Sequence, residues 1–326
     1  MNPSERIPVE PDDSWRTLEA RLTPRLLQRR LRLQRDRIAR ASLLTDTHVP
    51  CDSLPWFQRV GRAPFFVPGV ARLARSSCTN FEVTHNSPRL GGLPPPFHGF
   101  KILHLSDLHL GGPWDSMPDL IGRVSGLTFD LCVITGDFRY PGEGDFGPAM
   151  WDLGRLVPYI TTAIPPLVVL GNHDYIQMLP RLESMGLVVL LNEAMRLERD
   201  GFNVWVAGVD DSHFFGTHDL DRALKAVART ECAVLLSHSP DLHDEAAQRQ
   251  VRLYLCGHTH GGQLCLPGGI PIVSNCRSPR SLLSGAWTHA GMVGYTSRGV
   301  GHSGLPARVW CRPEVAVHSL LPAARA

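Results

Sequence analysis

Five short apolar runs dominate the hydrophobic pattern of the chain, and each ends in glycine or serine followed by polar side chains. The runs cover residues 102–105, 131–135, 167–170, 233–236 and 253–256. Their length is typical of strands that are buried on both faces of a sheet. In an open α/β sheet, the residues just past the carboxyl ends of the strands converge on one crevice. The pattern therefore predicts an α/β fold with a polar site at that edge of the sheet.

Weaker periodic patterns fill the intervals between these runs. Helical spacing predicts helices at residues 115–125, 151–160 and 219–228. Short β-rich segments predict further strands at residues 80–85, 187–191, 195–198, 204–208, 293–296 and 309–311. These intervals leave no room for a large lid, so we expect a compact core with an open mouth.

Side chains that commonly bind metal ions follow the five runs. They are Asp107, His109, Asp137, Asn172, His238, His258 and His260. A mixture of imidazole with carboxylate or amide oxygen suits Mn²⁺, Fe, Zn²⁺ or Co²⁺, and the absence of thiolates gives no preference for soft ions. The eight cysteines show no C-x-x-C spacing, so we expect no separate zinc site built from cysteines.

Taken in order, these residues resemble the five motifs of the calcineurin-like metallophosphoesterases. The motifs are Asp107-x-His109, Gly136-Asp137, Gly171-Asn-His-Asp174, the single His238 and Gly257-His-Thr-His260, and the likeness covers roughly residues 80–318. The resemblance implies the four-layer αββα sandwich of that superfamily and two divalent metal ions, for which manganese is the leading expectation. It also implies that Asp107, His109 and His260 hold one ion. Asn172, His238 and His258 would hold the other, and Asp137 would bridge them.

The implied chemistry is attack on phosphorus without a covalent enzyme intermediate. Two divalent ions carry four positive charges and two aspartates return two negative ones, so the site attracts an anion. A water shared by two ions loses its proton near neutral pH and becomes a metal-bridging hydroxide. The resemblance gives His173 the role of protonating the leaving oxygen or steadying the transition state. Asp174 is expected to orient His173 or to cap a helix, and the cap is the favoured interpretation.

Residues 296–306 are expected to form a loop that closes one edge of the crevice. Its Gly-x-Gly-x-x-Gly spacing matches a dinucleotide fingerprint, but Pro306 and a β-rich continuation replace the helix that such a site needs. Arg298 is a candidate for bidentate phosphate binding, and Arg139 is a second one. His302 is expected to assist. A solvated surface position is the alternative for both arginines.

The segment before the predicted domain is basic and amphipathic. Residues 15–41 hold nine arginines against two acids, while Trp15, Leu18, Leu22 and Leu26 recur at helical spacing. Pro24 should kink or divide this helix. Its apolar side either lies on an anionic membrane surface or packs on the catalytic domain or a second subunit. Aromatic residues among residues 51–75 extend the possible membrane contact to residues 15–75.

Composition and targeting signals narrow the class of protein. A chain of 326 residues that is 43% hydrophobic and 20% charged is ordinary for a globular protein, and a formal net charge of +2 gives no argument for a nucleic-acid partner. No secretory signal is evident, so the cytoplasm is expected, with peripheral attachment to the inner face of the membrane as an extension. We expect an N-terminal extension at residues 1–78 and a catalytic domain at residues 79–322. The sequence indicates no oligomeric state.

The expected activity is hydrolysis of phosphodiester or pyrophosphate bonds. Residues 257–263 and 297–306 resemble a bacterial single-domain branch of the superfamily. This branch includes membrane-associated phosphodiesterases and one type of UDP-2,3-diacylglucosamine pyrophosphatase of lipid A biosynthesis. A lipid-linked substrate of that kind is the most specific expectation. The alternatives are a phosphomonoesterase or protein phosphatase acting on a soluble substrate, and a non-catalytic scaffold.

Overall fold

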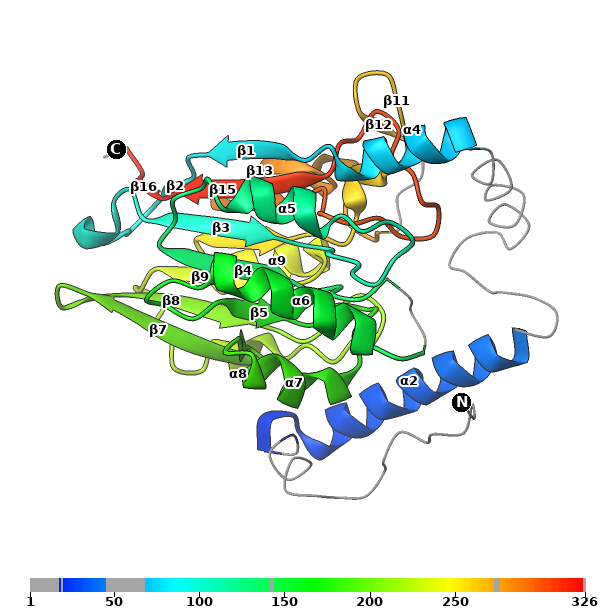
Figure 1. The fold of residues 1–326 in the computed structure, drawn as a ribbon. Coiled ribbons are helices and arrows are strands. Elements are labelled where there is room, and N and C mark those ends of the chain that lie inside the picture. Colours follow the sequence, from blue (N-terminus) through cyan, green and yellow to red (C-terminus); the bar gives the residue numbers. More distant parts are fainter. Residues whose placement is uncertain (1–17, 19, 45–67, 141–143, 273–275, 325–326) are drawn as a thin grey trace.

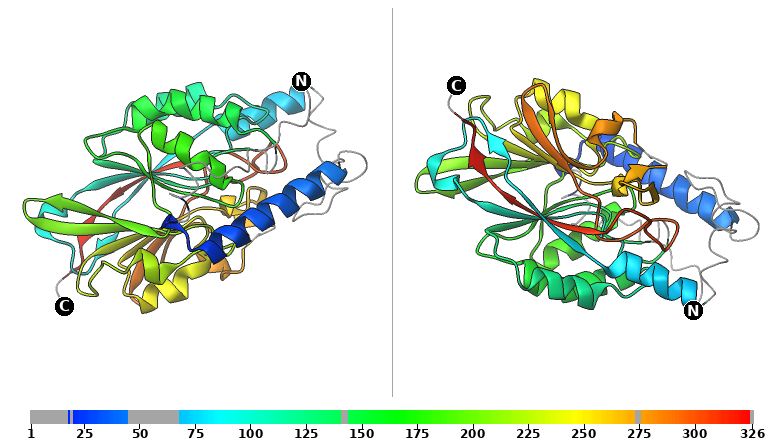
Figure 2. Two further views of the ribbon diagram at one scale, coloured as in Figure 1. Left: turned by 90° about the horizontal axis from the view of Figure 1, so that it is seen from below. Right: turned by 90° about the horizontal axis from the view of Figure 1, so that it is seen from above.

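The computed structural model describes residues 18, 20–44, 68–140, 144–272 and 276–324 (Figure 1). Two six-stranded sheets pack face to face, and helices cover the outer face of each sheet. Figure 2 shows the two sheets between their helical layers. The predicted four-layer αββα sandwich is therefore confirmed.

The first sheet carries the first three motifs. Its strand order is β1 (Glu82–Asn86), β15 (Glu314–Ser319), β3 (Lys101–Leu105), β4 (Leu131–Thr135), β5 (Leu167–Val169) and β6 (Val188–Val189). Strands β3 to β6 are parallel, so their carboxyl ends meet at one edge. The outer helices are α5 (Met117–Val124), α6 (Gly147–Ile160) and α7 (Leu179–Ser184).

The second sheet carries the last two motifs. Its strand order is β13 (Gly285–His289), β14 (Met292–Thr296), β10 (Leu253–Cys256), β9 (Ala233–Leu236), β8 (Phe202–Gly208) and β7 (Glu193–Arg199). Strands β8, β9, β10 and β14 are parallel, while β7 and β13 run antiparallel to their neighbours. The outer helices are α8 (Leu220–Ala223) and α9 (His243–Gln248).

The central strands bury side chains on both faces. In β4, Val133 faces the second sheet and Ile134 faces the outer helices. In β8, Val206 faces the first sheet and Ala207 faces the outer helices of its own sheet. This double burial explains why the motif strands appear in the sequence as unbroken apolar runs. It also fixes the strand ends rigidly against the core, which is the support that a precise site requires.

The basic N-terminal segment packs on the catalytic domain. Residues 18, 20 and 21 are helical, and α2 (Pro24–Leu44) begins at the proline, so Pro24 divides the predicted helix. Leu18, Leu22 and Leu27 are buried in the same core cluster as α5, α6 and α7. Of the alternatives for this apolar side, packing on the catalytic domain is the one that the structure shows. Trp15 and the aromatic residues between positions 56 and 66 lie outside the described residues.

Several short elements complete the fold. They are α4 (Pro68–Thr79), β2 (Arg89–Leu90), β16 (Leu321–Pro322), β11 (Cys265–Leu266), β12 (Ile270–Pro271), and the 3₁₀ helices η2 (Pro95–Phe97), η3 (Ile176–Met178), η4 (Pro240–Leu242), η5 (His260–Gly262) and η6 (Arg280–Leu282). The predicted strand at residues 309–311 is wrong, because Val309 forms only an isolated bridge to Leu264. The helix predicted over residues 219–228 is limited to Leu220–Ala223, since Asp219 caps its first turn and irregular turns follow.

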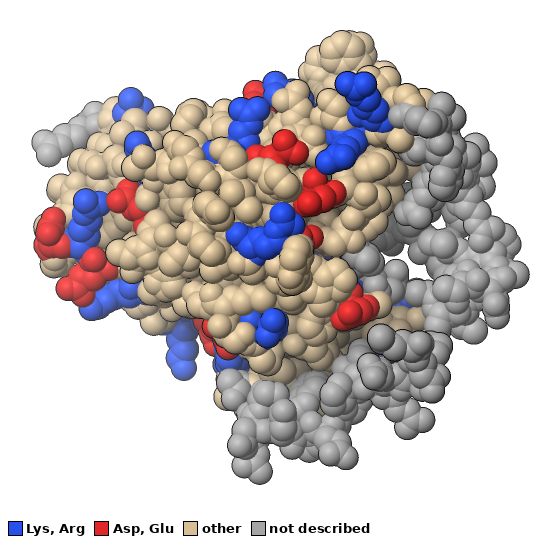
Figure 3. All heavy atoms as spheres, viewed as in Figure 1, with Lys and Arg blue, Asp and Glu red and all other residues tan. Residues whose placement is uncertain are grey.

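The surface carries charges of both signs. On the face shown in Figure 3, Lys and Arg side chains are interspersed with Asp and Glu. Within the part of the chain that is described, no helix is both long and apolar enough to cross a membrane. The boundary expected between residues 78 and 79 stays a prediction, and it falls within the last turn of α4, which ends at Thr79.

Candidate active site

The metal-ligand side chains predicted from the sequence meet between the carboxyl ends of the two sheets. Each follows the end of β3, β4, β5, β9 or β10, and each is less than one-tenth exposed. These seven residues, hereafter the seven ligands, are Asp107, His109, Asp137, Asn172, His238, His258 and His260. Five separate chain segments thus deliver them to one buried point.

Two triads can be distinguished within the seven ligands. In the first, Nε2 of His260 lies 3.5 Å from Oδ1 of Asp107 and 3.0 Å from Nε2 of His109. In the second, Nε2 of His238 lies 3.4 Å from Oδ2 of Asp137 and 3.2 Å from Nδ1 of His258. Within each triad, the three ligand atoms lie within 4.8 Å of one another.

Asp137 lies between the two triads. Its Oδ2 is 3.6 Å from Nε2 of His109 and 3.4 Å from Nε2 of His238, so a single carboxylate oxygen faces a histidine of each triad. Oδ1 of Asn172 is 2.9 Å from the same nitrogen of His238. This is the position that a bridging carboxylate occupies in a two-metal site.

The hydrogen bonds around the histidines show that the site is built for cations. Nδ1 of His109 faces the carbonyl oxygen of Arg139 at 3.1 Å, and Nδ1 of His238 faces that of Thr135 at 2.8 Å. A carbonyl only accepts, so each Nδ1 carries a hydrogen and each Nε2 faces the centre, where it can direct a lone pair at a metal ion. Lone pairs of nitrogen and oxygen that converge in this way fit a pair of metal ions.

Electrostatics support the same interpretation. Burial lowers the pKa of the His109 imidazole and brings the pKa of His258 to about 3, so both rings are neutral and able to bind metal. Burial also acts to lower the pKa of His238, but the charge of Asp137, the hydrogen bond to Asp137 and the charge of Asp107 together outweigh burial and raise the pKa to about 10. A centre that attracts a proton so strongly stabilises positive charge.

Five of the seven ligands have left-handed backbone conformations. Their φ angles are 50° for Asp107, 44° for His109, 54° for Asp137, 70° for His258 and 51° for His260. For a residue other than glycine, such a conformation costs on the order of 1 to 3 kcal/mol and persists only where the surroundings impose it. Strain of this kind clusters at functional sites.

Two motif glycines allow the strand ends to approach. A Cβ atom on Gly257 would lie 1.9 Å from Oγ of Ser106 and 2.2 Å from Oδ2 of Asp107. A Cβ atom on Gly171 would lie 2.3 Å from Oδ1 of Asp137. Both glycines are therefore required by the close packing of the ligands.

A family model for calcineurin-like phosphoesterases matches residues 100–262, half of the chain. The chain belongs to this family. The Bacillus subtilis metallophosphoesterase YkoQ is 30% identical over 271 residues, covering 78% of this chain and 96% of YkoQ. YkuE of the same organism is 29% identical over 248 residues, covering 73% of this chain and 85% of YkuE. A Danio rerio protein named "Transmembrane protein with metallophosphoesterase domain" is 28% identical and is covered over 53% of its length, against 68% of this chain.

Family membership makes the chain a calcineurin-like phosphoesterase, an enzyme that hydrolyses phosphoesters with divalent metal ions. The seven ligands have the donor chemistry that such ions require, and the structure brings all of them together. Two of the three metal-ligand groups that adjoin the centre are the triads described above, and the third joins His109 and Asp137 with His173.

His173 borders the metal centre of this phosphoesterase. Its backbone N–H donates to Oδ1 of Asp137 at 2.7 Å, and its ring meets that of His109 edge-on with centroids 4.8 Å apart. Nδ1 lies 3.3 Å from the carbonyl oxygen of Tyr140, so Nδ1 carries the hydrogen. This arrangement leaves Nε2 as the atom able to exchange a proton.

Asp174 has a different role from the helix cap favoured by the sequence. It accepts hydrogen bonds from the backbone N–H groups of Asp137, Phe138 and Gly171, at 2.8 to 2.9 Å. The carboxylate therefore ties the loop after β4 to the loop after β5. The correction follows from tertiary structure, because two of these donors lie more than 30 residues earlier in the chain.

The three expected substrate-binding residues differ in position. Arg298 forms ion pairs with Glu314 and, at 3.0 Å, with Glu82. Arg139 is buried, donates to the carbonyl oxygen of His173 at 2.5 Å and lies 3.7 Å over the ring of Tyr175. Both guanidinium groups are thus engaged within the protein.

His302 is also buried at the rim of the site. Its ring meets Tyr140 edge-on at 5.0 Å, and Tyr140 in turn donates from its hydroxyl group to the carbonyl oxygen of Gly304. A contact between His302 and substrate stays a prediction.

Sequence reasoning missed several residues that support the ligands. Nη2 of the buried Arg308 lies 3.2 Å from Nδ1 of His260 and donates to the carbonyl oxygen of Arg298. Arg37 of α2 donates to the carbonyl oxygen of Asn172 at 2.6 Å. One signal was available: Arg30, Gln34 and Arg37 have the spacing of one helix face and all three contact residues 172–177.

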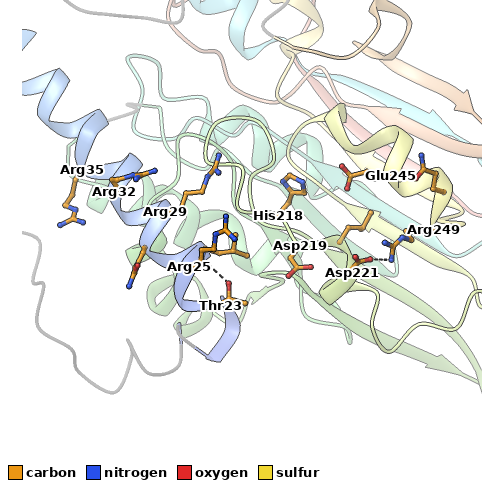
Figure 4. Close-up of a pocket in the computed structure, with 14 residues that line it drawn as sticks. Thr23, Arg25, Arg29, Arg32, Arg35, His218, Asp219, Asp221, Glu245 and Arg249 are labelled. Carbon is orange, nitrogen blue, oxygen red and sulfur yellow. Dashed lines mark hydrogen bonds and ion pairs between the residues drawn. The ribbon is translucent and has the colours of Figure 1, made fainter.

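A groove separates α2 from the helices of the second sheet. Figure 4 shows Arg25, Arg29, Arg32 and Arg35 extending from α2, and Asp219 and Asp221 on the other wall. The groove holds about 950 Å³, and none of the seven ligands lines it. Five arginines and three carboxylates line it, and the metal centre remains the candidate site of catalysis.

Proposed function

We propose that this phosphoesterase hydrolyses phosphodiester or pyrophosphate bonds with two divalent ions held by the seven ligands. The observation that carries the proposal is the position of Asp137, whose Oδ2 faces both His109 and His238. When bound, two divalent ions supply activated water and neutralise charge on phosphoryl oxygens. Nitrogen and oxygen donors suit Mn²⁺, Fe, Zn²⁺ and Co²⁺ alike, and manganese is the one that we propose as the native metal.

The protein's own residues perform the remaining steps. Asp107, His109 and His260 hold one ion, and Asn172, His238 and His258 hold the second, with Asp137 shared by both. His173 is held by its backbone bond to Asp137 and by the bond from Nδ1 to the carbonyl oxygen of Tyr140. When the ring is doubly protonated, Nε2 is the atom positioned to give a proton to the leaving oxygen.

A lipid-linked substrate such as UDP-2,3-diacylglucosamine is the specific form of this proposal, acting at the inner face of a membrane. Its support is the resemblance of residues 257–263 and 297–306 to the branch described above, together with the Danio rerio relative, which is named a transmembrane protein. Contact with the membrane through residues 15–75 is part of the same proposal. Because Leu22 and Leu27 are buried, that contact would rely on the exposed arginines of α2 and on residues outside the described part.

Metal analysis and a panel of substrates test the reaction type. Bis(p-nitrophenyl) phosphate and UDP-2,3-diacylglucosamine should be hydrolysed with higher kcat/KM than p-nitrophenyl phosphate. A clear preference for p-nitrophenyl phosphate would overturn the proposal and favour a phosphomonoesterase or protein phosphatase.

Asp137→Asn tests the bridging role. Removal of the shared charge leaves two cations facing each other with less screening, so the variant should lose both metal and activity. Inductively coupled plasma mass spectrometry gives the metal content. Asp119→Asn, at an exposed position of α5, is the matched control and should retain both.

A further inference from the structure

Three side chains of the second sheet's outer layer form a cluster that the catalytic reaction does not use. His243 and Asp244 are the first two residues of α9, and His289 is the last residue of β13. One ligand atom from each lies within 4.8 Å of the others. Among the metal-ligand groups found in the described residues, this is the one that shares no residue with the catalytic centre.

The hydrogen bonds of His243 fix its tautomer. Nδ1 lies 3.1 Å from the carbonyl oxygen of Pro240, which can only accept, so Nδ1 carries the hydrogen. A backbone carbonyl bonded to the far nitrogen is the usual support of a metal-binding histidine. Nε2 is therefore the nitrogen left to bind a metal ion, and it faces Oδ2 of Asp244 at 3.6 Å. A ring nitrogen and a carboxylate oxygen that face each other in this way favour a cation between them.

His289 completes the cluster from a different element. Its Nε2 lies 2.7 Å from Oδ1 of Asp244, and its ring centroid lies 4.8 Å from that of His243. The Asp244 carboxylate therefore meets one imidazole through each oxygen. The side chain of His243 is 11% exposed, that of His289 34% and that of Asp244 68%. The cluster is thus supported from beneath and open to water on one side.

We propose that His243, Asp244 and His289 bind a zinc ion. Two imidazole nitrogens, one carboxylate oxygen and a water molecule make the four-coordinate set that zinc prefers. The single negative charge of Asp244 favours a divalent cation over a neutral ligand, and borderline nitrogen donors favour zinc over magnesium or calcium. The proposal goes beyond the proposed function, because it involves none of the catalytic residues.

An ion at this position would join the helical layer to the second sheet. The helix α9 follows His238 in the chain through η4, and β13 pairs with β14, the neighbour of β10. Zinc would therefore restrain two elements that flank the strands from which His238 and His258 extend. We expect zinc binding to raise the melting temperature of the folded protein, because the unfolded chain lacks the preformed cluster.

Equilibrium dialysis of the full chain at micromolar free zinc tests the site. The wild type should bind one zinc ion per chain more than His289→Asn or Asp244→Asn, and zinc should raise the melting temperature of the wild type by more than that of either variant. Both substitutions are at partly or largely exposed side chains, so the fold should be preserved. His85→Asn, at an exposed histidine of β1, is the matched control and should match the wild type.

The outcome is decided by comparison of these variants. Equal zinc counts in the wild type, His289→Asn and Asp244→Asn would overturn the proposal, as would an equal loss in His85→Asn. Hydrolysis of bis(p-nitrophenyl) phosphate by each variant reports separately on the catalytic centre. If the variants show that there is no zinc site, the proposed reaction is unaffected. If hydrolysis is absent, the difference in zinc content between the wild type and the variants still tests the zinc site.

Discussion

His173 is held through both its backbone and its ring. Its backbone is bonded to Asp137, while its side chain is oriented by the carbonyl oxygen of Tyr140. Arg139 holds the carbonyl oxygen of His173 from below. Three separate contacts thus orient a residue whose proposed work is proton transfer and not metal binding.

His173→Ala should lower kcat by roughly 10² to 10⁴ while the metal content stays unchanged, since a general acid contributes about that much. The loss should be smaller for p-nitrophenolate, a leaving group that needs no proton, than for an alkoxide. Steady-state kinetics with both substrates provides the measurement. An equal loss for the two leaving groups would contradict the acid role.

At this scale, the sequence indicated that the seven ligands lie close together, but it did not indicate the partners of the arginines. The ligands follow buried apolar runs directly, so local pattern places them at strand ends. Arg298 could not be placed in that way, because Glu82 lies 216 residues away in the chain. The hydrogen bonds of Asp174 could not be predicted for the same reason, since two of its donors come from the loop after β4.

Side chains of the helix α2 contact and stabilise the loop that follows β5. Arg30 forms an ion pair with Asp210 at 2.7 Å, both side chains being fully buried, and donates to the carbonyl oxygen of Asp174. Gln34 accepts from the N–H of Ile176 at 3.0 Å. The loop that carries Asn172 and His173 is thus held from outside the catalytic domain.

Arg30→Met should lower the free energy of unfolding by about 3 to 5 kcal/mol, because it leaves the carboxylate of Asp210 buried without its partner. Urea denaturation measures this loss. Arg35→Met, at an exposed position of the same helix, should change it by less than about 0.5 kcal/mol.

The double variant Arg30→Met, Asp210→Asn separates the ion pair from packing. It should recover part of the lost stability, because the unpaired charge is gone. If Arg30→Met and Arg35→Met were equally stable, the ion pair of Arg30 with Asp210 would not stabilise the fold. The helix itself was predicted from its periodicity, but the buried arginine was not, because nothing local distinguishes Arg30 from its eight basic neighbours.

At the scale of the whole molecule, a buried chain of hydrogen bonds joins three strands of the first sheet, β15, β3 and β4. Thr135 donates to Ser106, which donates to Oδ2 of Asp107. His104 must therefore donate to Thr135 through Nε2, and its Nδ1 accepts from Nε2 of His318 at 3.3 Å. Both histidines are neutral in this arrangement, which connects β15 to a metal ligand.

Acid should destabilise the fold through His318. Burial lowers its pKa to about 3, whereas the unfolded chain binds a proton below pH 6.5. Stability from this group is complete above pH 6.5 and is lost as pH falls toward 3, by about 1.4 kcal/mol per pH unit. Urea denaturation in chelator across this range should show a shallower slope for His318→Gln. The exposed His85→Gln should keep the wild-type slope, and identical slopes for all three proteins would refute the assignment.

The left-handed backbone of five ligands means that the side chains needed for catalysis lower the stability of the fold. At positions 107, 109, 137, 258 and 260, glycine is the residue that the backbone accepts most readily. Asp137→Gly should therefore melt at a higher temperature than Asp137→Ala in metal-free protein, although both lack the bridging carboxylate. A library of variants screened for heat resistance alone would drift toward glycine at these positions and lose catalysis. Any thermostabilisation of this enzyme consequently needs hydrolysis as a second criterion.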